Sequence, residues 1–370
     1  MKDITIERVE DESDLKDFIN LPFKIYEKDP YWVPPLISDQ KALFSRKNPF
    51  FEHAEAAFFI AKKNGIPAGR IVAIVNYKHL EFHNEKAGFF GFFETVHDNT
   101  VAGELLDKTR EWLKDKGMEI MRGPMNFSTN EECGFLVEGF DTSPFLMMPY
   151  NPPYYIEIVE RYGLKKAKDL FAYMVEIPNE IPERIMRVAD FARSNGVSVR
   201  PLNMKKFDDE IDAFKRVYNS AWSRNWGFIP MTEKEIDWMA ERLKTLIIPD
   251  LTLIAEIDRK PAGFFLALPD FNQVLKRLNG RLGISGIIKT LWYSRKITDL
   301  RILILGILKE YRKKGIDALF YLEAWKAARN REYKRAEFSW VLEDNVLVHR
   351  VAEMLGARLY KKYRIYEMRI

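Results

Sequence analysis

An internal repeat constrains this chain more than any other feature of its sequence. Residues 58–75 and 252–269 align without a gap at an offset of 194, and six of the aligned positions are identical. Each segment has two apolar runs joined by a turn with charge, Gly or Pro, which is typical of a β-hairpin. Further pairs follow in the same order, among them Phe18 with Phe214 upstream and Tyr173 with Tyr366 downstream. The repeat therefore predicts two copies of one structural unit, at residues 1–178 and 179–370.

Each copy has the same expected order of elements. A first strand leads into a helical, aromatic stretch and the hairpin, then a strand, a long helix, a strand, a helix and a closing strand. In the second copy the last five are expected at 301–308, 318–330, 335–342, 346–355 and 358–369. Strands and helices in this order predict an α/β or α+β fold with helices layered on a mixed sheet.

Composition excludes several classes of protein. The chain of 370 residues has a net charge of only +4, which is low for a dedicated nucleic-acid binder. The single cysteine, Cys133, excludes a disulfide framework, and five His without metal-type spacing give no reason to expect a metal. The N-terminus has no signal-type apolar core, and no apolar run is long enough to span a bilayer. We expect a soluble, cytoplasmic protein that binds neither nucleic acid nor metal.

The stretch 302–318 carries the strongest chemical signal. An apolar strand ends in a basic loop with one loop glycine, Gly315, and a helix follows at once. Helix N-termini attract anions, and Arg312, Lys313 and Lys314 add positive charge where a diphosphate would bind. A solvated basic turn before a helix is the alternative.

This stretch resembles the pyrophosphate loop of the GNAT acyl-CoA N-acyltransferases. The expected later blocks are also present, at 343–345 and at 356–357. The whole chain further resembles the bacterial YghO-like group, which is related to bacterial ceramide synthases. Its matching blocks are 123–126, 147–155, 268–270, 278–280 and Trp340 ahead of 343–345.

The resemblance implies two tandem GNAT-like domains, each with a mixed, largely antiparallel sheet flanked by helices. The second domain, 179–370, would bind acyl-CoA or acetyl-CoA as cosubstrate. The first, 1–178, has acidic residues where the phosphate loop should be basic, so we expect it to bind no CoA and to shape the acceptor side. The expected CoA-binding residues are Ile307, Leu308, Lys309, Arg312, Lys313, Lys314, Gly315, Ile316 and Asn345.

Acyl transfer to an amine needs a base, a polarised carbonyl and close positioning. Glu337 and Glu343 flank the strand 335–342 and are the candidate bases, with Tyr366 as a candidate acid. A solvent-facing role for Glu337 and a structural role for Tyr366 are the alternatives. Many relatives carry a tyrosine where this chain has Ala352, and Asp317 is expected to cap its helix.

Two further segments point to the acceptor. The insert 271–296 has six basic residues and no acidic one, interleaved with apolar side chains, so it predicts either peripheral membrane contact or a helical hairpin that covers the sheet. The long loop 123–155 predicts an acceptor pocket or an ordered structural loop. The candidate substrate-binding residues are Asn126, Asn130, Asn151 and Trp340.

The sequence thus predicts an acyl-CoA-dependent N-acyltransferase, with an amine acceptor that is amphipathic or lipid-like. A non-catalytic protein that binds acyl-CoA or lipid is the alternative, favoured by Ala352 and Asp317. Nucleic-acid binding through the insert and the basic loop is a weaker third hypothesis.

Overall fold

A computed structural model describes residues 4–370, and its contacts divide the chain into two compact units. Unit 1 runs to Leu170 and adds Leu275–Lys289 and Lys361–Ile370. Unit 2 consists of Phe171–Val274 and Thr290–Tyr360. The sequence predicts two consecutive copies, 1–178 and 179–370. In the structure, the two later segments 275–289 and 361–370 belong to unit 1 instead.

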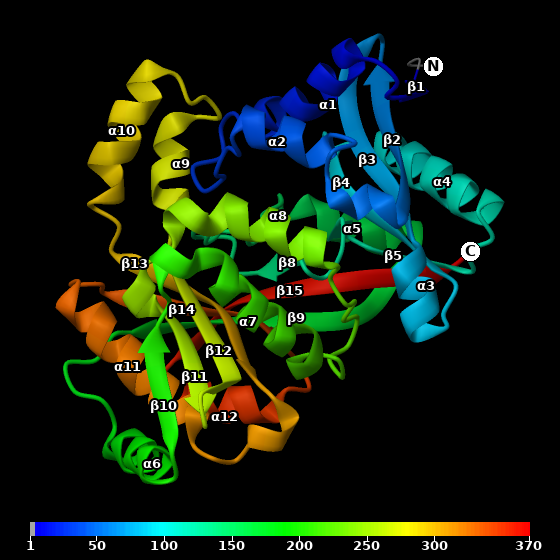
Figure 1. Cartoon of the computed structure of the whole chain (residues 1–370). Coiled ribbons are helices and arrows are strands. Elements are labelled where there is room, and N and C mark those ends of the chain that lie inside the picture. The colour runs from blue at the N-terminus through cyan, green and yellow to red at the C-terminus, as the bar shows by residue number, and fades with distance from the viewer. Residues whose placement is uncertain (1–3) are drawn as a thin grey trace. The chain divides into compact units, whose positions relative to one another are not determined.

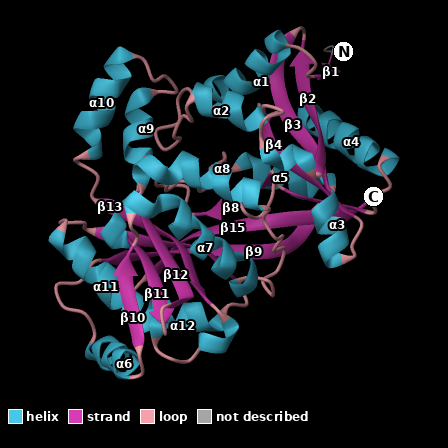
Figure 2. Ribbon diagram, viewed as in Figure 1, coloured by secondary structure: helices cyan, strands magenta, loops and turns pink. Residues whose placement is uncertain are grey.

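Figure 1 labels the elements, and Figure 2 separates helices from strands. The elements of unit 1 are β1 (Ile4–Arg8), α1 (Glu12–Ile25), α2 (Ile37–Phe44), η1 (Pro49–Glu52), β2 (Ala54–Lys63), β3 (Ile66–Asn76), α3 (Tyr77–His83), β4 (Ala87–Thr95), α4 (Asn99–Asp115), β5 (Ile120–Gly123), β6 (Met125–Asn126), β7 (Glu132–Cys133), β8 (Phe135–Glu138) and α5 (Tyr154–Tyr162).

Unit 2 repeats this order with its own helices. Its elements are α6 (Glu183–Ser194), β10 (Val197–Pro201), η2 (Met204–Lys206), α7 (Phe207–Ala221), α8 (Glu233–Leu243), η3 (Lys244–Leu246), η4 (Pro249–Leu251), β11 (Thr252–Ile257), β12 (Lys260–Pro269), β13 (Asp299–Ile307), η5 (Lys309–Tyr311), α11 (Ile316–Asn330), β14 (Arg335–Leu342) and α12 (Val346–Met354). Four elements have residues in both units: β9 (Lys165–Glu176), α9 (Asn272–Leu278), α10 (Ile284–Ser294) and β15 (Arg358–Arg369).

The strand order confirms the predicted mixed, largely antiparallel sheets. In unit 1 the order is β1-β2-β3-β4-β5-β15, and in unit 2 it is β14-β13-β12-β11-β10. Neighbours along both paths are antiparallel except β4 with β5 and β13 with β14, which are parallel. Each parallel pair is bridged by a long helix, α4 or α11, as a parallel connection requires.

The registers show how closely the two copies correspond. Gly69 of β3 pairs with Thr95 of β4, and its repeat partner Gly263 of β12 pairs with Ile307 of β13. Glu94 and Gly306 therefore occupy the same place in the two copies.

In each copy a helix that precedes the hairpin, α1 or α7, ends next to this shared position. Tyr26, at the end of α1, donates its hydroxyl to Glu94 at 2.7 Å. Trp222, at the end of α7, packs against Gly306 so closely that a Cβ there would lie 2.1 Å from the ring. One packing position is thus built from different residues in the two copies.

The last strand, β15, completes the sheet of unit 1 although its residues close the second copy. Tyr366 pairs with Gly123 of β5, and Tyr363 pairs with Leu136 of β8. Tyr366 joins the apolar core formed by Phe90, Leu105 and Tyr155.

Candidate active site

The parallel strands β13 and β14 separate part-way along their length. Their ladder has four rungs, from Asp299–Arg335 to Ile302–Phe338. β13 continues through residues 303–307 and β14 through 339–342, with no further rung between them among the residues described. The two strands therefore form a V whose vertex is the Ile302–Phe338 rung.

A bulge in β13 explains the separation. The register with β12 shifts between Leu266 and Ala267, whose partners are Ile304 and Ile302, so Leu303 is the extra residue. A bulge bends its strand and increases the local twist. Because this bulge directly follows the last rung with β14, it turns the rest of β13 away from that strand.

A basic loop leads from the open arm of the V into a helix. Leu308 donates its backbone N–H to Ala262 at 3.0 Å, and Arg312 donates to the carbonyl of Ala221 at 2.9 Å. Arg312 and Lys313 are exposed, and α11 begins at Ile316 directly after them. Unpaired N–H groups and the helix dipole make such an end attractive to anions.

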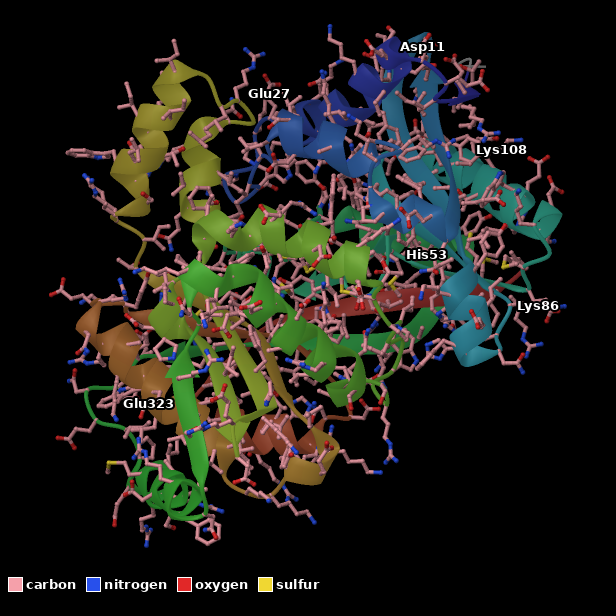
Figure 3. The ribbon with its side chains drawn as sticks, in the orientation of Figure 1. Asp11, Glu27, His53, Lys86, Lys108 and Glu323 are labelled. Atoms are coloured by element: carbon pink, nitrogen blue, oxygen red, sulfur yellow. The ribbon has the colours of Figure 1, made fainter. Side chains whose placement is uncertain are left out.

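The helix cap differs from the prediction. Gly315, with φ of +76°, is the N-cap of α11, and Asp317 lies in the first turn, so the prediction that Asp317 caps the helix is wrong. A Cβ on Gly315 would lie 2.8 Å from the carbonyl oxygen of Val188. The glycine is needed for close packing of α11 on α6, where Arg193 also donates to Glu323 at 2.6 Å. Figure 3 labels Glu323 on α11.

Glu337 is fully buried at the third rung of the ladder, so it does not face solvent. Ser339 and Tyr360 donate their hydroxyls to its two carboxylate oxygens. Arg301, also buried, lies 3.8 Å away and donates to Ser339 Oγ at 2.9 Å. A buried carboxylate with this many partners is a structural ion pair at the narrow end of the V.

The residues after β14 cap the next helix. Asn345 is the N-cap of α12 and accepts from the Val348 N–H at 3.4 Å. His349 lies 2.9 Å from the Tyr173 hydroxyl and 3.2 Å from the Glu343 carbonyl oxygen. Glu343 is half-buried in this loop, and Trp340 is half-buried on the arm of β14 beyond the ladder.

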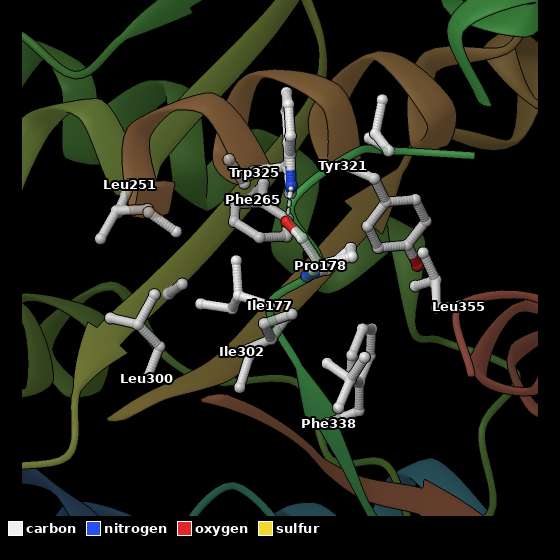
Figure 4. A pocket seen from close by; sticks show the side chains of 16 residues that line it. Ile177, Pro178, Leu251, Phe265, Leu300, Ile302, Tyr321, Trp325, Phe338 and Leu355 are labelled. Carbon is white, nitrogen blue, oxygen red and sulfur yellow. Dashed lines mark hydrogen bonds between the residues drawn. The ribbon is translucent and has the colours of Figure 1, made fainter. Parts of the chain in front are cut away.

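An apolar cavity of about 70 Å³ lies next to the vertex, between α11 and the sheet of unit 2 (Figure 4). Ile302 and Phe338 of the last rung line it, together with Phe265 and Tyr321. Trp325 in its wall donates its indole N–H to Pro178 at 2.9 Å. The cavity offers hydrocarbon contact and no charged group.

Comparison with known proteins decides the family. Protein YghO of Escherichia coli is 35% identical over 365 residues, which cover 97% of this chain and 93% of YghO. The bacterial ceramide synthase of Caulobacter vibrioides is 36% identical over 373 residues, covering 99% and 97%. The chain belongs to this YghO-like family. No family model matches it.

Solved structures share the fold of this YghO-like chain. A tandem GNAT protein from the clavulanic acid biosynthesis pathway has a TM-score of 0.59 at 11% identity, covering 99% of this chain and 98% of its own. A GCN5-related N-acetyltransferase from Sphaerobacter thermophilus has a TM-score of 0.52 at 12% identity, covering 99% and 95%. The predicted tandem GNAT fold is confirmed.

Four of the predicted site residues make hydrogen bonds within unit 1. Asn126 accepts from the Phe92 N–H at 2.7 Å. Asn151 is buried, accepts from the Leu136 N–H at 2.7 Å and donates to the Leu136 and Pro152 carbonyls. Tyr366 donates to Glu160 at 2.9 Å, and Asn130 donates its N–H to Ser128 Oγ at 3.2 Å. These four belong to unit 1, whereas the expected CoA-binding residues belong to unit 2.

The matching V in unit 1 is filled by the chain itself. The ladder of β4 with β5 ends at Phe89–Arg122. A Cβ on Gly91 would then lie 1.8 Å from the carbonyl oxygen of Met125, because the strand β6 lies against β4 there. The edge of β13 is open at this position, whereas β6 occupies the equivalent edge of β4.

Sequence reasoning missed a buried polar cluster around Glu94. The hydroxyls of Tyr26 and Tyr155 donate to the same Glu94 oxygen at 2.7 and 2.8 Å, and Arg70 lies 3.9 Å from the other. Burial raises the pKa of the Glu94 carboxyl, and Arg70 acts in the opposite direction. A carboxyl of this kind exchanges a proton closer to neutral pH than an exposed one. The residues of this cluster are far apart in the sequence. Its one sequence signal is that Glu94 in the first copy aligns with Gly306 in the second.

Two searches complete the description of residues 4–370. No group of three or more His, Cys, Asp or Glu in that range is arranged to hold a metal ion. Within the same range, no helix is both long and apolar enough to cross a bilayer.

Proposed function

We propose that this protein is an acyl-CoA-dependent N-acyltransferase whose CoA site is the V of β13 and β14 with the basic loop 308–315. The observation that carries the proposal is the bulged, separated edge of β13, which leads without interruption into an exposed basic loop and a helix N-terminus.

Each part of that arrangement matches one part of an acyl-CoA. The amide groups of pantetheine form hydrogen bonds as a strand does, so they suit the edge of β13 left without a neighbour. The diphosphate suits the Lys313 and Lys314 side chains and the N–H groups at the start of α11. The filled edge of β4 offers no such room, which supports a CoA site in the second copy alone.

The reaction needs little beyond this frame. The amine nitrogen attacks the thioester carbonyl carbon and a base takes the proton of the amine. The C–S bond then breaks, and the departing CoA thiolate takes up a proton to become the thiol. Backbone N–H groups of β13 would stabilise the oxyanion. Among the three predicted catalytic residues, Glu343 is the best placed base, because Glu337 is enclosed in its ion pair and Tyr366 belongs to unit 1.

An amphipathic, lipid-like amine is the proposed acceptor. The support is the relative from Caulobacter, whose name is that of a ceramide synthase, and the apolar lining near the vertex of the V.

Thermal unfolding with CoA, acetyl-CoA and palmitoyl-CoA tests the site. Lys313→Glu/Lys314→Glu reverses two charges in the loop, and Lys205→Glu/Lys206→Glu makes the same change at two exposed lysines of η2 in the same unit. A ligand at about 100 times its Kd adds roughly 2.7 kcal/mol. We expect that stabilisation in the wild type and the η2 variant and its loss in the loop variant. No stabilisation by any thioester refutes the proposal.

Release of free thiol separates an enzyme from a protein that only binds acyl-CoA. We expect thiol release that depends on a long-chain amine and a matching amide product by mass spectrometry. Thioester binding without thiol release, over a panel of short and long amines, would favour the non-catalytic alternative.

A further inference from the structure

The helix α10 presents its apolar side to solvent. Apolar residues recur at helical spacing along one stripe, and each is more than half exposed, by 52% to 84%. We call these residues the α10 stripe: Ile284, Ile287, Ile288, Leu291 and Trp292. A surface helix of a globular protein ordinarily buries such a stripe, so α10 is the reverse of the usual pattern.

The opposite side of α10 makes the protein contact. Gly286 is the buried residue of the helix, and a Cβ there would lie 3.1 Å from the Arg281 carbonyl oxygen. The preceding helix α9 is anchored normally, with Val274 and Leu278 buried. The alternative of a helical hairpin that covers the sheet therefore does not hold for α10.

Basic residues flank the stripe along the chain. Residues 271–296 include six basic side chains and no acidic one. Lys296 lies 4.6 Å from the centre of the Trp292 ring, a pairing of cation and aromatic ring that suits the boundary between headgroups and acyl chains. A hollow of about 610 Å³ beside the helix has Arg281 and Lys289 in its wall.

We propose that α10 lies in the surface of an anionic lipid bilayer, with the α10 stripe among the upper acyl chains and the surrounding basic side chains on the lipid phosphates. An apolar stripe with a cationic border is the pattern of an interfacial helix. The uniform positive charge selects this occupant, because a protein surface or a second copy of the chain would have to supply a dense acidic rim. The inference goes beyond acyl transfer and does not depend on it.

Co-sedimentation of the full chain with lipid vesicles tests the inference. The vesicles are pure phosphatidylcholine, or phosphatidylcholine with a third of phosphatidylglycerol. Ile288→Glu is compared with Ile66→Glu, because both isoleucines are 65% exposed and Ile66 lies in the β2–β3 hairpin. Thermal unfolding without lipid is expected to be the same for both variants and the wild type.

We expect the wild type and Ile66→Glu to sediment with the anionic vesicles, and Ile288→Glu to bind them at least tenfold more weakly. Binding of the wild type should fall steeply between 0.1 and 0.5 M salt. Failure of the wild type to bind, equal binding to neutral vesicles, or equal loss in both variants would overturn the inference. A dimer by light scattering that Ile288→Glu dissociates would also overturn it, because the stripe would then be a contact between copies. No thioester is present, so none of these outcomes depends on acyl transfer.

Discussion

The buried pair of Arg301 and Glu337 gives a direct test of what holds the vertex of the V. Glu337→Gln removes the negative charge and keeps the shape of the side chain. The carboxylate accepts from Ser339 at one oxygen and from Tyr360 at the other, whereas an amide offers one oxygen only. The variant therefore removes the negative charge that faces Arg301 and leaves one hydroxyl facing an N–H group.

The expected cost follows from burial. Breaking a buried ion pair by removing one partner costs about 3–5 kcal/mol. For a body of roughly 150–250 residues, each kcal/mol lowers Tm by about 2–4 °C, so Glu337→Gln should lower it by roughly 6–20 °C. Glu183→Gln is the control, because Glu183 and its partner Arg187 are both exposed on α6 at 3.7 Å, and it should leave Tm unchanged.

Differential scanning calorimetry and the thiol-release assay together decide the role of Glu337. We expect a large loss of stability, and a rate at low temperature that falls no more than the folded fraction does. A variant that unfolds like the wild type but transfers acyl groups at least a hundredfold more slowly would refute this reasoning and make Glu337 the base.

Three further predictions concern residues outside the loop and the stripe. Burial lowers the pKa of His79 from 6.5 to about 4. Between these two pH values the imidazole is protonated in the unfolded chain but neutral in the folded chain. Stability should therefore fall by about 1 kcal/mol between pH 6 and 5, and His79→Leu should flatten that dependence in urea unfolding. Asn151→Ala should lower the free energy of unfolding by about 2–3 kcal/mol, because the Leu136 N–H and carbonyl lose their hydrogen-bond partner. An unchanged Tm with a raised KM for the amine would instead support the predicted role of Asn151 in binding the acceptor. Ala324→Leu, which projects into the cavity beside the vertex, should raise stability by about 1 kcal/mol, and a lowered Tm would show that the cavity cannot take the added carbons.

The repeat made the hairpins and the order of strands predictable. Six identities at one offset placed Gly69 and Gly263 at equivalent positions of the two hairpins, and the registers of β3 and β12 confirm that equivalence. The loop before α11 was also predictable, because a strand, a basic run and a glycine are consecutive in the chain. The residues that form such features are neighbours in the sequence, so a local sequence pattern is enough to predict them.

The features that sequence reasoning missed depend on contacts between distant residues. Burial of Glu337 requires Tyr360 and Arg301, which come from two other strands. The pairing of β15 with β5 joins residues more than 240 positions apart, and no local pattern distinguishes it from a strand that closes its own copy. The exposure of the α10 stripe was similarly hidden, because the same spacing of apolar residues is found in buried helices.

The two copies show how one frame can lead to an open and a closed edge. Both have a V between parallel strands, and in both the helix before the hairpin packs on the same strand position. In unit 1 that position is Glu94, held by Tyr26, and the edge of β4 is taken by Met125 and Asn126. In unit 2 it is Gly306, covered by Trp222, and the edge of β13 stays open toward a basic loop. Filling the V removes a site for an extended amide-bearing ligand, so under the proposed function the first copy keeps the fold without a place for CoA.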